Sequence, residues 1–312
     1  MATLRGQNVR LFMWDETVST QAGQGAWVVF AKATSSTVTL TGNTEDASHK
    51  DIVGNAAMPE VVSKAWQMQV DALDVVDMNR ILQAMRTGEK IEVRFDETST
   101  SDNQTGIKAS MARNGYAYIT DATFNFNDRE NSVKNITLTG TGALTKNQPS
   151  EDFYPVTPSA AFTKGQFVRI FLGNDNSATP SAALAFAKQL AFHVSVSLEN
   201  STTKDTEGNW IVQEPVGLSY DISTNALVRS DETITSLVNG QTFSDIEDIY
   251  EASAPVKFEI ANVSGTNNRT KGSVLISGSV VITSLVLNAP NRQTATYDAQ
   301  MQGYGDYTVN HS

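Results

Sequence analysis

Residues 119–142 read ITDATFNFNDRENSVKNITLTGTG, and residues 282–305, 163 positions later, read ITSLVLNAPNRQTATYDAQMQGYG. Each stretch consists of an apolar and β-branched segment, a polar turn, a second such segment and two closing glycines. Each therefore predicts a β-hairpin, with Arg129 or Arg292 in the turn. The closing glycines let the chain leave the sheet in conformations that other residues avoid.

Shorter blocks around these hairpins recur in the same order. Residues 6–12 (GQNVRLF) match residues 165–171 (GQFVRIF), and Phe-Ala-Lys occurs at 30–32 and again at 186–188. The distance between matching blocks drifts only between 154 and 165 positions. Because order and spacing are both kept, we interpret the chain as an internal duplication.

The 312 residues are enough for two domains, each with its own core. We expect a first domain at 1–145, a proline-containing linker at 146–163 and a second domain at 164–312. Short alternating segments dominate both halves, and each half has one short helical pattern. The sequence therefore predicts a mainly β protein with two tandem β-sandwich or barrel domains, each flanked by one short α-helix.

Three details of this prediction can be checked directly. The polar segment 42–60 is too long for an ordinary hairpin connection and is expected to be a loop. The first helix is expected to end at Gly88. The second helix is expected to begin with a capping box of Ser244 and Glu247.

Composition excludes several function classes. The chain has no cysteine, which removes disulfides, thiolate nucleophiles and zinc-thiolate sites. The apolar runs are far shorter than the roughly 20 residues that cross a bilayer, so no membrane anchor is expected. Net charge is −11, with 17 acids and 14 bases in residues 1–150 but 17 acids and 9 bases in the remainder. Without a basic run, tight binding to nucleic acid phosphates is not expected.

Catalysis is not expected either. The three histidines are His49 in a loop, His193 within an apolar strand and His311 at the C-terminal end, and they form no ligand cluster or Ser-His pair. His193 is expected to be a satisfied core or sheet residue. No phosphate loop, nucleotide fingerprint or calcium loop is present, so no enzyme activity, cofactor or metal is predicted.

An ordered set of residues in the first half resembles the major tail proteins that form the tail tube of long-tailed bacteriophages. The set comprises Gly6 to Phe12, Ala-Thr-Ser-Ser at 33–36, Ser48-His-Lys-Asp51 with Gly54, and Trp66 followed by Asp-Ala-Leu at 71–73. The resemblance covers nearly all of residues 1–145 and extends weakly to 160–312. This chain departs from the usual member in having two tube-type domains and no evident immunoglobulin-like decoration domain.

The resemblance implies packed β-sheets flanked by a helix, in subunits that close into rings and stack into a hollow tube. A ring with six positions can be filled by three double domains, so a trimer with pseudo-sixfold symmetry is expected. The implied partners are other copies of the chain and other tail proteins, such as the tape measure, distal tail and terminator proteins, with DNA as a passing cargo. The implied location is the virion tail, after assembly in the cytoplasm of the bacterial host.

Two polar segments, 42–60 and 199–217, each contain a Lys-Asp pair and are the candidate contacts between rings or subunits. Trp66, which lies on an alternating strand, is expected in the core, whereas Trp210 is a candidate interface anchor. The candidate contact residues are Ser48, His49, Lys50, Asp51, Thr203, Lys204, Asp205 and Trp210. A solvated surface loop, in which such a pair is worth little, is the other interpretation of these segments.

The same strands and threonine-rich sheets also suit a tandem β-sandwich that binds carbohydrate or a cell-surface receptor, as in a phage fibre or an adhesin. Such a binder would remain a discrete monomer or small oligomer and retain a glycan. A tube protein would polymerise. A capsid or other tail component, and the inner tube of a contractile tail, are nearer alternatives.

Overall fold

In the computed structural model the chain is described over fourteen ranges. These are residues 6–20, 23–30, 33–49, 57–73, 78–98, 106–146, 148–149, 151–154, 164–176, 178–184, 186–206, 208–228, 240–264 and 270–310. Strands make up most of these ranges, and the mainly β architecture predicted from the sequence is confirmed. Within the same ranges, no helix has the length and apolar character needed to cross a membrane.

The first half contains nine strands and one α-helix in its described ranges, after a 3-10 turn at Gly6–Asn8. In chain order they are β1 (Val9–Thr20), β2 (Gly23–Val29), β3 (Ala33–Asp46), β4 (Pro59–Leu73), α1 (Met78–Thr87), β5 (Ile91–Glu97), β6 (Gly106–Ile107), β7 (Arg113–Asn127), β8 (Val133–Thr145) and β9 (Glu151–Tyr154). Helix α1 ends before Gly88, whose positive φ of 62° suits glycine, as predicted.

The second half also contains nine strands and one α-helix in its described ranges, after a 3-10 turn at Gly165–Phe167. They are β10 (Val168–Leu172), β11 (Ala182–Leu184), β12 (Ala187–Asn200), β13 (Gln213–Leu227), β14 (Gly240–Gln241), α3 (Phe243–Ala252), β15 (Val256–Ser264), β16 (Thr270–Asn288), β17 (Thr296–Gly303) and β18 (Thr308–Val309). The capping box of α3 is Thr242 with Asp245, not Ser244 with Glu247. The helix begins at Phe243, so Ser244 already lies in its first turn.

Strand pairing has the same pattern in both halves. The pairs β1–β2, β1–β5, β3–β4, β4–β8, β5–β7 and β7–β8 correspond to β10–β11, β10–β15, β12–β13, β13–β17, β15–β16 and β16–β17. Irregularities recur too: β3 shifts register after Asn43 and β12 after Ser197. Arg129 and Arg292 both adopt positive φ, at 61° and 62°.

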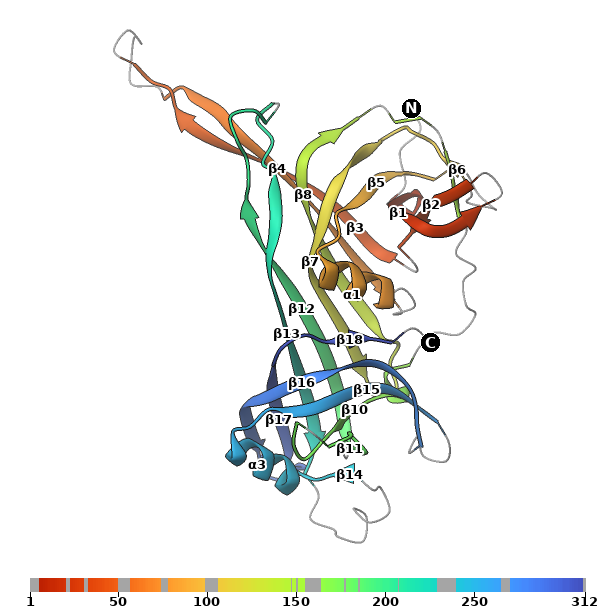
Figure 1. The fold of residues 1–312 in the computed structure, drawn as a ribbon, viewed down its shortest axis with the longest axis vertical. Helices are drawn as coiled ribbons and strands as arrows, with labels where there is room; N and C mark the ends of the chain where they lie inside the picture. Colours follow the sequence, from red (N-terminus) through yellow and green to blue (C-terminus); the bar gives the residue numbers. More distant parts are fainter. Residues whose placement is uncertain are drawn as a thin grey trace.

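The centre of the molecule is a continuous antiparallel sheet that runs through both halves. Eight strands of the described ranges pair in the order β3-β4-β8-β7-β12-β13-β17-β16. The seam between the halves is the β7–β12 pair, in which Ser195 lies opposite Asp121 and Gln189 opposite Asn127. In Figure 1 these long strands run between an upper body that contains α1 and a lower body that contains α3.

One face of this sheet covers the hydrophobic core. Met68, Phe124, Phe192 and Ile222 are all 0% exposed and belong to one cluster of buried side chains that includes residues of both halves. The hydroxyl of Tyr307 donates to the carbonyl of Leu82 at 2.8 Å, so the C-terminal segment is also bonded to α1.

Trp66 lies in this core, 2% exposed, as predicted. Its indole Nε1 donates to the carbonyl of Gly142 at 3.0 Å. A Cβ on Gly140 would lie 2.1 Å from the indole ring, so glycine leaves the space that the ring occupies. In the second half, a Cβ on Gly303 would lie 2.5 Å from the ring of Tyr220.

Two expectations for the connections are wrong. Much of the segment 42–60 is a β-hairpin arm rather than a loop, because β3 and β4 stay paired out to Asp46 and Pro59. All described residues of this arm beyond Gly42 except Ser63 are exposed; it extends to the upper left in Figure 1. These strands therefore pair through their backbones without a covering layer.

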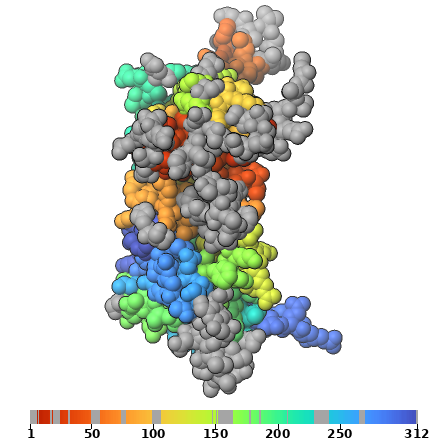
Figure 2. Space-filling model, turned by 90° about the vertical axis from the view of Figure 1, so that its right-hand side faces the viewer, coloured from red at the N-terminus to blue at the C-terminus, as the bar shows by residue number. Residues whose placement is uncertain are grey.

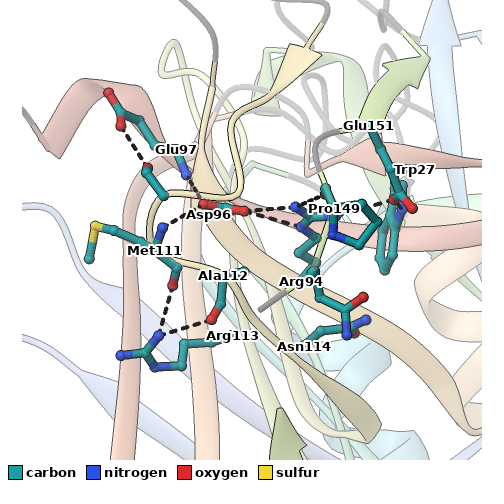
Figure 3. Close-up of polar contacts among 12 residues, drawn as sticks. Trp27, Arg94, Asp96, Glu97, Met111, Ala112, Arg113, Asn114, Pro149 and Glu151 are labelled. Carbon is teal, nitrogen blue, oxygen red and sulfur yellow. Dashed lines mark hydrogen bonds and ion pairs between the residues drawn. The ribbon is translucent and has the colours of Figure 1, made fainter. Parts of the chain in front are cut away.

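The segment 146–163 is not simply a linker, because it includes strand β9. This strand pairs in parallel with β2 and antiparallel with β6. Beside it, Arg94 is 0% exposed and bonds to Asp96 at 2.9 Å, Glu151 at 3.2 Å and the carbonyl of Pro149 at 2.7 Å (Figure 3). Trp27 also donates to Glu151. The buried guanidinium thus fixes Pro149 and Glu151 against the first half.

Candidate functional site

The second face of the central sheet carries polar side chains. Side chains alternate along a strand, so the residues between the core positions share this face. We call it the polar face and define it by the paired positions Ser35, Thr37, Thr39, Gln67, Gln69, Asp71, Asp121, Thr123, Asn125, Asn127, Asn135, Thr137, Thr139, Gln189, Ala191, His193, Ser195, Ser219, Asp221, Ser223, Asn225, Ser284, Val286, Asn288, Asp298, Gln300 and Gln302.

The charged groups among these positions are of one sign. Asp71, Asp121, Asp221 and Asp298 are acidic, His193 is titratable, and the defined set contains no lysine or arginine. Such a surface repels phosphate groups rather than binding them. Hydrogen bonds among its members fix the carboxylates: Ser35 and Asn135 both donate to Asp71 at 2.6 Å, and these bonds lower the pKa of Asp71.

His193 lies at the seam between the halves, as a hydrogen-bonded sheet residue. Its Nδ1 is 2.7 Å from Asp221 on β13, and its Nε2 is 2.8 Å from Asp121 on β7. Burial by itself lowers the pKa of His193, but the hydrogen bonds to Asp121 and Asp221 outweigh burial and raise it above 6.5. The His193 side chain therefore links three strands from two halves through its two ring nitrogens.

We predict that this link makes stability depend on pH. A histidine whose pKa is raised on folding stabilises the native state below its unfolded pKa, and the contribution is lost as the pH rises through the folded pKa. Relative to His193→Gln, the wild type should be more stable at pH 5 by about 1 kcal/mol, discounted for partial exposure. This difference should shrink as the pH rises through the folded pKa, which lies above 6.5, as measured by thermal unfolding. His49→Gln, which replaces an exposed histidine of the arm, is the comparison variant; a pH-independent difference for His193→Gln would contradict the assignment.

The central sheet has two open edges within the described ranges. At one edge β3 pairs only with β4, and at the other the end of β16, Ser284–Asn288, pairs only with β17. Large apolar side chains lie exposed at both: Leu40 is 58% exposed, Val286 47% and Leu287 52%. Open edges of this kind pair readily with another strand.

The structure separates the two candidate contact segments. In the arm, Ser48 donates from its backbone to Asp46 at 2.9 Å, and its hydroxyl bond lowers the pKa of Asp46. His49 is exposed, while Lys50 and Asp51 lie outside the described residues. In the second segment, Thr203, Lys204 and Asp205 are exposed in a turn between β12 and β13.

Trp210 contacts the same chain. The amide of Lys64 on β4 donates to the carbonyl of Asn209 at 2.6 Å, and the amide of Ile211 donates to the carbonyl of Lys64 at 2.9 Å. The Lys64 ammonium lies 5.9 Å from the centre of the Trp210 ring, and Trp210 packs half-buried against the core. The second segment therefore supports the base of the arm within one molecule.

Sequence analysis did not identify the polar face or the two edges. The signal for the face was available, since Thr, Gln, Asn and Asp alternate with apolar residues along β4, β7, β8 and β13. The order of strands across the seam was not, because β7–β12 pairing joins residues more than 60 positions apart. Among the described residues, no group of three or more His, Asp or Glu is arranged to hold a metal ion.

Comparison with known proteins gives structural matches only. No family model matches the sequence, and no curated protein matches it. The structure is similar to a chain in the tail of an empty gene transfer agent particle (TM-score 0.35, 15% identity, 48% of this chain and 99% of that chain) and to one in the virion of the native gene transfer agent (0.34, 16%, 48% and 99%). It is also similar to the SPP1 tail tube protein (0.36, 17%, 47% and 80%).

Proposed function

We propose that this protein is a structural component of a bacteriophage tail, whose copies close into rings that stack into a hollow tube. The observation that carries the proposal is the central sheet, with an apolar face on the core, a polar face opposite and an open edge at each side. Closing several such sheets edge to edge removes every open edge and produces a barrel wall.

In this arrangement the polar face lines the lumen. Its four aspartates and its lack of lysine and arginine suit a channel through which DNA passes as cargo, because phosphates are not held. The apolar face is already covered by the helices and by the remaining strands. These covering elements form the outer part of the wall.

The repeated pairing pattern supports a ring of three chains. If each half of the chain fills one of six equivalent positions, three chains complete a ring with pseudo-sixfold symmetry. The tandem tube-type domains, 1–145 and 164–312, are then neighbours around the ring, joined by the β7–β12 seam that is already formed within one chain.

The arm of β3 and β4 is the proposed contact with an adjacent ring. Its exposed apolar residues, Met58, Val61 and Val62, are 48%, 40% and 41% exposed. Ser48 and His49 lie on its described outer part, Lys50 and Asp51 follow them in the sequence, and Thr203, Lys204 and Asp205 lie in the segment that supports its base. At the tube ends the partners are the tape measure, distal tail and terminator proteins, in a virion tail assembled in the host cytoplasm.

Electron microscopy and native mass spectrometry of the purified protein test the proposal. We expect rings or tubes with a regular axial repeat and three chains in each ring. Six chains in a ring would contradict the trimer. A persistent monomer that retains a glycan would contradict the tube and favour a carbohydrate-binding protein.

A further inference from the structure

The turn between β7 and β8 fills a groove in the second half of the same chain. The amide of Gly165 donates to the carbonyl of Glu130 at 3.0 Å, and the amide of Asp128 donates to the carbonyl of Lys188 at 2.8 Å. A Cβ on Gly165 would lie 2.2 Å from the carbonyl oxygen of Asn127. Residue 165 must therefore be glycine, because the β7–β8 turn of the first half occupies the space that a side chain would need.

The first half contains the matching groove, and there it is open. A groove of about 580 Å³ is lined by residues that include Gly6, Val9, Ala33, Thr34 and Ser35. Gly6 occupies the position of Gly165 in the repeated GQ-x-VR block, yet a Cβ on Gly6 would meet no atom of the described residues within 4 Å. Within the part of the chain that the structure describes, the space that receives a turn in one half is unfilled in the other.

The second half contains a turn that matches the β7–β8 turn but does not enter a groove of this chain. The turn between β16 and β17 corresponds to the turn between β7 and β8, with Arg292 matching Arg129 in sequence and in positive φ. Residues 286–294 are all exposed. Figure 2 shows this end of the hairpin as a blue finger that stands clear of the rest of the molecule.

We propose that the β16–β17 turn of one copy of the chain inserts into the Gly6 groove of the next copy, while Ser284–Asn288 pairs antiparallel with β3. The inference rests on the proposed assembly into rings and specifies its contact. Transferring the β7–β12 register places Thr39 opposite Val286 and Thr37 opposite Asn288. It also directs the Gly6 amide to the Gln293 carbonyl.

The side chains buried at the β7–β12 seam indicate which side chains the proposed contact between copies would bury. Leu40 matches Val194 and Leu287 matches Phe124, and both seam residues are 0% exposed. Their counterparts at the open edges are more than half exposed. Pairing the edges therefore buries apolar side chains on the core side, while Thr39 and Val286 remain on the polar face.

Cysteine pairs test the register, and the chain has no native cysteine to interfere. Thr39→Cys with Val286→Cys should form disulfides between chains, since directly opposed Cβ atoms lie about 4.5–5.5 Å apart. His193→Cys with Thr123→Cys, the matching pair at the seam, should link within one chain. Thr37→Cys with Ser284→Cys lies four residues out of register and should not link.

A substitution at Gly6 tests the groove. Gly6→Leu should leave the monomer's thermal unfolding unchanged, because the added side chain meets none of the described residues, but raise the concentration needed for half-assembly by about tenfold or more. Gly165→Leu is the matched variant and should destabilise the monomer itself.

The outcomes separate the contact from the function. If rings form but the Thr39–Val286 disulfide does not, or if Gly6→Leu assembles normally, this contact is wrong. The proposed tube function would still stand. A wild-type chain that stays monomeric at every concentration would overturn both. Links between chains at Thr39 and Val286, absent from the offset pair, would establish the contact.

Discussion

Replacing Gly140 by alanine is expected to lower the free energy of unfolding by about 3 kcal/mol, at the upper end of the cost of overpacking. The added Cβ would lie 2.1 Å from the indole of Trp66, a separation that requires the ring or the strand to move. Trp66 cannot easily move, because it is 2% exposed and donates to the Gly142 carbonyl. Urea unfolding followed by circular dichroism measures the change.

A double-mutant cycle isolates the cause. Trp66→Ala removes the indole atoms that Gly140→Ala meets, so the double variant should be more stable than the sum of the two single costs allows. Gly42→Ala is the control, since its Cβ would lie at an ordinary 3.5 Å from Val61, and it should change stability by less than about 0.5 kcal/mol. Additive costs in the cycle would show that Trp66 is not the reason for glycine at 140.

Replacing Asp96 by alanine is expected to cost about 3–5 kcal/mol, the range for breaking a buried ion pair. Arg94 and Asp96 are both 0% exposed. The variant would leave the Arg94 guanidinium without its 2.9 Å partner and would also leave the amides of Glu97 and Met111, at 2.8 Å and 3.0 Å, without an acceptor. The broken ion pair and the two amides left without an acceptor account for most of the loss, although Arg94 keeps its bonds to Glu151 and Pro149.

The double variant Arg94→Met with Asp96→Leu removes both charges and should recover much of this loss. Lys108→Met provides the exposed comparison: its ammonium is 3.0 Å from Glu97, but the lysine side chain is 33% exposed, so the cost should be less than about 1 kcal/mol. Equal urea midpoints for Asp96→Ala and Lys108→Met would contradict a special role for the buried pair.

Local pattern was enough to predict some features. The two hairpins, the end of α1 at Gly88 and the burial of Trp66 follow from alternation and glycine conformation, which act within a few residues. The arm was mistaken for a loop because its strands bury almost nothing, so no hydrophobic alternation marked them. Strand β9 was missed because proline and serine surround a segment whose pairing partners, β2 and β6, are distant in sequence.

The sequence by itself determined that the chain is mainly β, that its blocks recur in order and that cysteine chemistry is absent. Only the tertiary structure decided that the halves share one sheet through β7 and β12, and that the edge at β3 and the end of β16 remain open. The physical reason is that backbone pairing is nearly independent of side-chain identity. The residues can specify which segments become strands, but the choice of neighbour depends on how the complete chain packs.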